Sequence, residues 1–87
     1  MEQAYIDTLN RMKNEGIAGI VFNGKFQFDI KYQEGTLYFS KVIDYITKEV
    51  LVPDIHSVSC PYELVEKNLD ILVESFMKKY VYYNIDI

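Results

Sequence analysis

The residues best suited to chemistry lie together in one short stretch, PDIHSVSC, at positions 53–60. His56 and Cys60 are the only histidine and the only cysteine of the chain, and Asp54 precedes His56 by two positions. A Cys/His pair could supply a nucleophile and its base, and a helix N-terminus favours an ionised thiol. The base needs a third group to orient it, however, and no clear candidate is present. The simpler interpretation is a surface loop that leads into a helix cap.

The sequence supports a metal site or a phosphate-binding site even less than a catalytic Cys/His pair. A zinc site needs three or four ligands, which one histidine and one cysteine cannot provide. The glycines at positions 16, 19, 24 and 35 are spread over turns and a strand, and they form neither a G-x-G-x-x-G nor a Walker pattern. Asp29 lies in the middle of a predicted strand on its wet face, where cross-strand pairing explains it. We therefore predict no catalytic residue, no metal and no cofactor.

The bulk composition is that of a small folded protein. Its 87 residues fit a single domain, with 49% hydrophobic and 25% charged residues. One cysteine excludes an internal disulfide, which secreted domains of this size usually carry, and the start MEQAYIDTLNRMK lacks a signal-peptide pattern. No apolar run approaches the ~20 residues that a membrane span needs. We expect a cytoplasmic protein with no membrane partner.

Net charge separates the remaining classes of partner. At −4, the chain has the wrong overall sign for nonspecific binding to nucleic-acid phosphates. Aromatic side chains on a sheet can stack single-stranded bases, and Phe26, Phe28, Tyr38 and Phe39 raise that possibility. The aromatic face of residues 25–32 is their only apolar face, however, so helices must cover it. We predict no direct contact with nucleic acid, because an acidic surface suits a basic protein partner better.

An N-terminal helix is predicted over residues 2–15. Tyr5, Leu9 and Met12 recur at spacings of four and three, which places them on one face of a helix. Gly16 then supplies the left-handed residue that ends many helices. We expect this helix to pack on the core.

A three-stranded antiparallel meander is predicted over residues 17–40. Asn23-Gly24 is a strong hairpin signal, because both central residues of a type I′ turn need positive φ. Residues 25–32, KFQFDIKY, alternate apolar and polar side chains, which is typical of a strand with one buried face. A polar turn then leads to the returning strand TLYFS at 36–40.

The next twenty residues are harder to assign. Residues 41–52 fit a helix and a strand, and their β-branched side chains favour a fourth strand at about 48–52. Pro53 ends that strand. Residues 53–60 are expected to be a loop.

The last part of the chain predicts a helix and a strand. The helix covers residues 61–79, with Pro61 at the first helical position and Cys60 or Ser59 as the cap. Its apolar face steps by four, three, four and four residues along Val65, Leu69, Leu72, Phe76 and Tyr80, with Leu64 alongside. Residues 81–87 switch to a period of two, which predicts an edge strand that pairs within the chain's own sheet or with another chain.

These elements predict an α+β fold in the order α-β-β-β-(β)-α-β. Three to four strands form an antiparallel meander, the two helices pack on it, and the C-terminal strand adds an edge. Tyrosine, with eight residues, is over-represented, and it is enriched at interface hot spots because it buries a large area at small entropic cost. An AT-rich genome would explain the same excess. The predicted partner-binding residues are Tyr38, Tyr45, Tyr82, Tyr83, Asp86, Glu66, Asp70 and Glu74.

We therefore expect a small acidic protein-binding module that is not an enzyme. In size, charge and order of elements the chain is loosely similar to some small anti-CRISPR inhibitors, which implies a phage or mobile-element protein that inhibits a host nucleic-acid-binding or defence protein. The similarity includes no shared motif, so it assigns no residues. Two alternatives stay open: a small-ligand-binding or enzymatic domain that uses residues 54–60, and a homodimer formed through the C-terminal strand.

Overall fold

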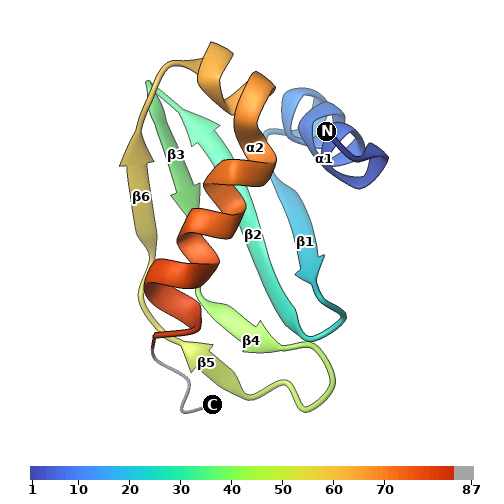
Figure 1. Ribbon diagram of the computed structural model, residues 1–87, viewed down its shortest axis with the longest axis vertical. Helices are drawn as coiled ribbons and strands as arrows, with labels where there is room; N and C mark the ends of the chain where they lie inside the picture. Colours follow the sequence, from blue (N-terminus) through green and yellow to red (C-terminus); the bar gives the residue numbers. More distant parts are fainter. Residues whose placement is uncertain (84–87) are drawn as a thin grey trace.

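The computed structural model describes residues 1–83 and confirms the α+β class (Figure 1). Both helices pack against one antiparallel sheet, with α2 running diagonally across it and α1 lying against β1. The elements in chain order are α1 (Gln3–Glu15), β1 (Ala18–Phe22), β2 (Phe26–Gln33), β3 (Thr36–Phe39), β4 (Val42–Asp44), β5 (Val50–Val52), β6 (His56–Ser59), α2 (Tyr62–Phe76) and the π-helical turn η1 (Met77–Val81).

The predicted meander is present in β1, β2 and β3. β2 pairs antiparallel with β1 on one side and with β3 on the other. Asn23 and Gly24 have φ values of 54° and 66°, as a type I′ turn requires. Glu34 and Gly35 repeat this geometry, with φ values of 51° and 78°. The first helix is also confirmed, and Gly16 ends it in the left-handed region with φ at 83°.

Within residues 1–83 the sheet has six strands, more than the three to four that were predicted. One cause is a β-bulge at Ser40. β2 pairs with β3 at Ile30–Phe39 and with β4 at Phe26–Asp44, so the four residues 40–43 oppose the three residues 27–29. The Ser40 N–H donates to the Asp29 carbonyl (2.9 Å), and the Asp29 N–H donates to Ser40 Oγ (2.8 Å). β3 and β4 are therefore two halves of one interrupted strand.

The prediction for the middle of the chain was only partly right. The strand expected at about 48–52 is β5, but its partner β4 was not predicted. The loop expected over 53–60 was confirmed for residues 53–55 and 60 and wrong for the rest, because His56–Ser59 form β6 and pair with β3. The sequence HSVS has little apolar character, so its own preference for a strand is weak and its pairing with β3 stabilises it as one.

α2 and η1 together replace the single helix predicted over residues 61–79, and they differ from it in the N-cap, in one internal residue and in the buried face. Pro61 occupies the N-cap position with extended ψ (151°), and no side chain caps the helix, so the caps predicted at Cys60 or Ser59 were wrong. The helix contains one non-helical residue, Asn68, with φ at −130°. The buried face is rotated from the predicted one, because Leu64 is exposed. The residues that α2 and η1 bury are Val65, Leu69, Val73, Phe76, Met77 and Val81.

The strand predicted over 81–87 was wrong for its first three residues. Val81 ends the π-helical turn η1 with no exposed surface, and Tyr82 follows in a turn. The Tyr82 ring packs edge-on against Phe26, with centroids 5.8 Å apart. Val81 and Tyr82, whose alternation had predicted a strand, thus pack against the core from the end of a helix. The rest of that prediction, including Asp86, lies outside the described residues.

The core fills the space between the sheet and the helices. The alternation predicted for β2 is confirmed, because Phe26, Phe28 and Ile30 are buried while Asp29 and Lys31 are exposed on the opposite face. An antiparallel sheet commonly packs one face on the core and leaves the other to solvent. The remaining strands and α1 add Leu9, Met12, Ala18, Leu37, Phe39, Val42 and Val52 to this core.

Candidate functional site

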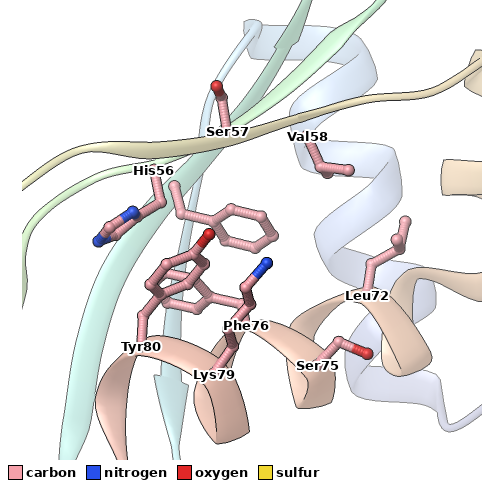
Figure 2. Close-up of a pocket in the computed structure, with 9 residues that line it drawn as sticks. His56, Ser57, Val58, Leu72, Ser75, Phe76, Lys79 and Tyr80 are labelled. Carbon is pink, nitrogen blue, oxygen red and sulfur yellow. The ribbon is translucent and has the colours of Figure 1, made fainter. Parts of the chain in front are cut away.

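A groove lies between the edge strand β6 and the C-terminal half of α2 (Figure 2). It encloses about 180 Å³. Figure 2 shows side chains from the strand and the helix converging on this space. The lining residues are Phe39, His56, Ser57, Val58, Leu72, Ser75, Phe76, Lys79 and Tyr80.

The floor of the groove is aromatic. The rings of Phe39 and Phe76 are stacked, with centroids 4.2 Å apart and planes 6° from parallel. Phe76 also contacts Phe28 at a centroid distance of 5.2 Å, so the floor continues into the core. All three rings are buried, and packing therefore fixes their orientation.

One end of the groove is formed by His56 and Tyr80. Their rings are stacked, with centroids 3.7 Å apart and planes 16° from parallel. His56 points to the helical face because it pairs with Phe39 in the sheet, and paired residues share a face. Tyr80 reaches the strand from η1, one helical step after Phe76. The pair joins the edge of the sheet to the end of the helix.

The outer edge of β6 offers unpaired backbone groups. The Cys60 N–H donates to the Gly35 carbonyl (3.0 Å). Hydrogen-bonded pairs alternate along an antiparallel ladder, so Val58 and His56 also direct their backbone groups at β3. The N–H and C=O groups of Ser57 and Ser59 point the other way, where no strand among residues 1–83 pairs with β6. Such an edge is a template for another strand.

The lining of the groove combines aromatic and polar side chains. Among residues 1–83, Lys79 is the only lining residue with a full charge, and no carboxylate accompanies it. The pair suggested by the sequence is not assembled, because three residues of extended strand lie between His56 and Cys60 and place their Cα atoms about 13 Å apart. Cys60 is buried, and that burial raises the pKa of its thiol, which disfavours the nucleophilic thiolate. Within residues 1–83, no group of His, Cys, Asp and Glu is arranged to hold a metal ion.

The tyrosines predicted to bind a partner are scattered over the molecule. Tyr38 lies on the sheet face opposite the helices, with Lys31 Nζ 5.4 Å from its ring centroid. Tyr45 lies in the turn between β4 and β5, and it is exposed. Tyr82 is half-buried against the core, whereas Tyr83 is 84% exposed. Tyr38 therefore lies on the face of the sheet opposite to the core against which Tyr82 packs.

The predicted acidic residues of α2 lie away from the groove. Glu66 and Glu74 are exposed, and Asp70 is half-buried. Asp70 and Glu74 lie close enough to Tyr5 of α1 to act on its ionisation, so this acidic face adjoins the first helix. The sequence thus identified an acidic surface, but one that is separate from the aromatic groove.

The groove itself was missed because its parts came from segments with different predictions. Phe76 and Tyr80 were assigned to the core-facing side of a helix, and His56 was assigned to a loop. The signal that could have revealed the site is the alternation in HSVS, directly before the helix whose aromatic residues lie opposite.

No protein-family model, curated protein or solved structure matches this chain. Its functional interpretation therefore comes from its own geometry. No helix within residues 1–83 has the length and apolar character that crossing a membrane requires.

Proposed function

We propose that this chain is a non-enzymatic protein-binding module that receives an extended peptide segment along β6. The observation that carries this proposal is the open edge of β6 beside an aromatic groove, since strand addition needs both features. The added strand forms backbone hydrogen bonds with the sheet edge, and alternate side chains enter an adjacent pocket.

The backbone supplies the first half of this recognition. Ser57 and Ser59 each direct an N–H and a C=O outward from β6, and these groups match the spacing of an incoming strand. The side chains of both serines are small and exposed, so they leave room for the approach of another backbone. Residues of this kind provide affinity for any extended segment and little preference for its sequence.

The groove supplies the preference for particular side chains in the bound peptide. The stacked rings of Phe39 and Phe76 offer an apolar floor to one side chain of the peptide, and His56 and Tyr80 close one end. Lys79 extends over the Tyr80 ring, with Nζ 5.3 Å from its centroid, and gives this end a positive charge. A segment with an aliphatic or aromatic residue next to an acidic one fits this arrangement.

The narrower roles expected from the sequence stay predictions. Inhibition of a host nucleic-acid-binding or defence protein would require a partner that carries the segment described above or a second contact with a basic surface. The predicted homodimer would pair the C-terminal segment as a strand, but residues 81–83 are helical or in a turn. A ligand site at residues 54–60 would have to use His56 without Cys60.

The proposal is tested by selecting binders from a library of random linear peptides displayed on phage. The decisive variant is Ser57→Pro, which removes an outward N–H and leaves the ladder with β3 intact, because proline is tolerated on the free side of an edge strand. We expect the wild-type chain to enrich peptides with alternating apolar residues, and Ser57→Pro to lose them.

Two controls make this test specific. Val21→Pro removes an exposed-edge N–H from β1, on the other side of the sheet, and should leave the selected peptides bound. Lys79→Glu should shift the selection from acidic to basic flanking residues. Equal binding by wild type and Ser57→Pro, with both variants folded by circular dichroism, would show that β6 does not receive the peptide.

A further inference from the structure

A second open strand edge lies on the opposite side of the sheet, between α1 and β1. β1 pairs with β2 on one side, and no strand among residues 1–83 pairs with its other side. A groove of about 260 Å³ runs between this edge and α1. Its lining residues are Glu2, Ala4, Tyr5, Thr8, Gly19, Ile20, Val21, Phe22 and Asn23.

The direction of the β1 backbone follows from the hydrogen bonds of β2. Asp29 directs its N–H and C=O at Ser40, on the side of β2 away from β1. Its neighbours Phe28 and Ile30 therefore direct theirs at β1, because the groups alternate. Gly19 is the Cα partner of Asp29 in the pairing of β1 with β2, so Gly19 and Val21 direct their backbone groups at the open groove.

The charge around this groove differs from that of the groove at β6. Glu2 lines it, and Tyr5 forms part of its helical wall. Burial raises the pKa of Tyr5, and the carboxylates of Glu74, Glu2 and Asp70 raise it further. Among residues 1–83, Glu2 is the one of these acids that lines the groove, whereas Asp70 and Glu74 belong to α2, which packs against α1. No lysine or arginine within residues 1–83 forms an ion pair with any of the three. Their negative charge is thus available to a partner.

We propose that the α1–β1 groove is a second docking edge, and that its occupant is a basic extended segment of a partner protein. The strand of the partner adds to Gly19 and Val21, and its lysine or arginine side chains reach Glu2, Asp70 and Glu74. This site takes the opposite charge to the β6 groove, where Lys79 is the charged residue. The chain therefore holds two different segments on the two edges of one sheet.

A second copy of this chain does not fit the groove in a symmetric way. A two-fold pairing of β1 with β1 places the same surface on both sides of the interface. The three carboxylates of each copy would then face one another, and juxtaposed like charges cost free energy. Charge complementarity therefore points to a basic partner segment.

The test uses two short synthetic peptides, one of alternating lysine and valine and one of alternating glutamate and valine. Each is titrated into the isotope-labelled chain, and backbone amide shifts are recorded by NMR. We expect the lysine peptide to shift the amides of Gly19, Val21 and Tyr5. The glutamate peptide should leave these amides unchanged.

Variants separate this proposal from the one for β6. Val21→Pro should abolish the response to the lysine peptide, and Ser57→Pro should leave it intact. The double change of Asp70→Asn and Glu74→Gln should weaken binding by about fivefold at low salt, because charge pairs near the surface each contribute little to affinity. Added salt should produce a similar loss in the wild type.

Three outcomes would overturn the proposal. One is a lysine-peptide response that Val21→Pro does not change. Another is equal binding of both peptides, which would show that Glu2, Asp70 and Glu74 do not select for a basic segment. The third is concentration-dependent self-association through β1 in sedimentation experiments, because a second copy would then occupy this edge.

Discussion

The imidazole ring of His56 is stacked on the phenol ring of Tyr80, with centroids 3.7 Å apart and planes 16° from parallel. His56 belongs to the edge strand β6 and Tyr80 to the helical end η1, so this contact joins two segments that are far apart in the chain. Phe76 contacts both rings, and its ring centroid lies 6.1 Å from that of His56 and 5.8 Å from that of Tyr80. The three rings fix the distance between strand and helix, and with it the width of the groove.

His56→Ala is expected to destabilise the fold by about 1 kcal/mol, because an aromatic pair contributes roughly 0.5–1.5 kcal/mol beyond its buried area. His56→Phe keeps a flat ring over Tyr80 and should recover most of that loss. Urea denaturation of the two variants and the wild type measures the difference. If His56→Phe is as unstable as His56→Ala, the stacking of the rings is not what stabilises this contact.

The face that α2 and η1 bury is tested by Met77→Ala and Leu64→Ala. Met77 has no exposed surface, and its truncation should cost roughly 3 kcal/mol in the free energy of unfolding, because a buried cavity is left behind. Leu64, which the sequence placed on the buried face, is 38% exposed and should cost less than about 1 kcal/mol. Chemical denaturation gives both values. The reverse order would restore the face predicted from the sequence.

Regular local patterns predicted much of the fold. The alternation of residues 25–32 identified β2 because its two faces meet different surroundings, and Asn23-Gly24 identified the turn because few other pairs adopt positive φ twice. The spacing of Tyr5, Leu9 and Met12 identified α1 for the same kind of reason. In each case the local sequence and the tertiary environment agree.

The elements that were missed depend on contacts with distant parts of the chain. β6 contains two serines and one histidine, and its pairing with β3 makes it a strand. Val81 and Tyr82 alternate as a strand would, but the core accepts them at the end of a helix. The candidate groove needed both of these contacts, so neither segment could predict it separately. Tertiary packing overrides local propensity at such places.

Tyr82 and Tyr83 were predicted to act together at a partner surface, and the structure gives them different roles. Tyr82 packs against Phe26, and its hydroxyl accepts a hydrogen bond from Asn23 Nδ2 (3.1 Å). Tyr82→Ala should therefore cost roughly 2 kcal/mol of stability. Tyr83 is 84% exposed, so Tyr83→Ala should change stability by less than about 0.5 kcal/mol. Thermal unfolding of both variants measures this, and equal losses would contradict it.

Cys60 is predicted to react slowly with thiol reagents while the chain is folded. It is 9% exposed, and burial raises the pKa of its thiol, so the reactive thiolate is disfavoured. Labelling with iodoacetamide at neutral pH, followed by mass spectrometry, should show slow modification of the native chain and fast modification in denaturant. Rapid labelling of the native chain would reopen the interpretation of residues 54–60 as a reactive site.

Asp44 is expected to make the turn between β4 and β5 sensitive to acid. Its Oδ1 accepts hydrogen bonds from the N–H groups of Thr47 (2.9 Å) and Ile46 (2.8 Å). These bonds, with that of Thr47 the larger cause, hold the pKa of Asp44 below its usual value in spite of partial desolvation. A carboxyl group with a lowered pKa in the folded state stabilises the fold above its ordinary pKa. That contribution is lost as the pH falls through the lowered value.

Asp44→Asn tests this turn, because the amide oxygen can accept the same hydrogen bonds but carries no charge. At neutral pH the variant should unfold at a lower temperature than the wild type. The difference should shrink as the pH falls below about 4, near the ordinary pKa of aspartate, since the wild type then loses the same charge. Circular dichroism melts over this pH range provide the measurement.

Asp54→Asn is the matched control, because the structure gives the Asp54 carboxylate no hydrogen bond within residues 1–83. A gap between Asp44→Asn and wild type that is constant with pH would show that the charge of Asp44 does not stabilise the turn.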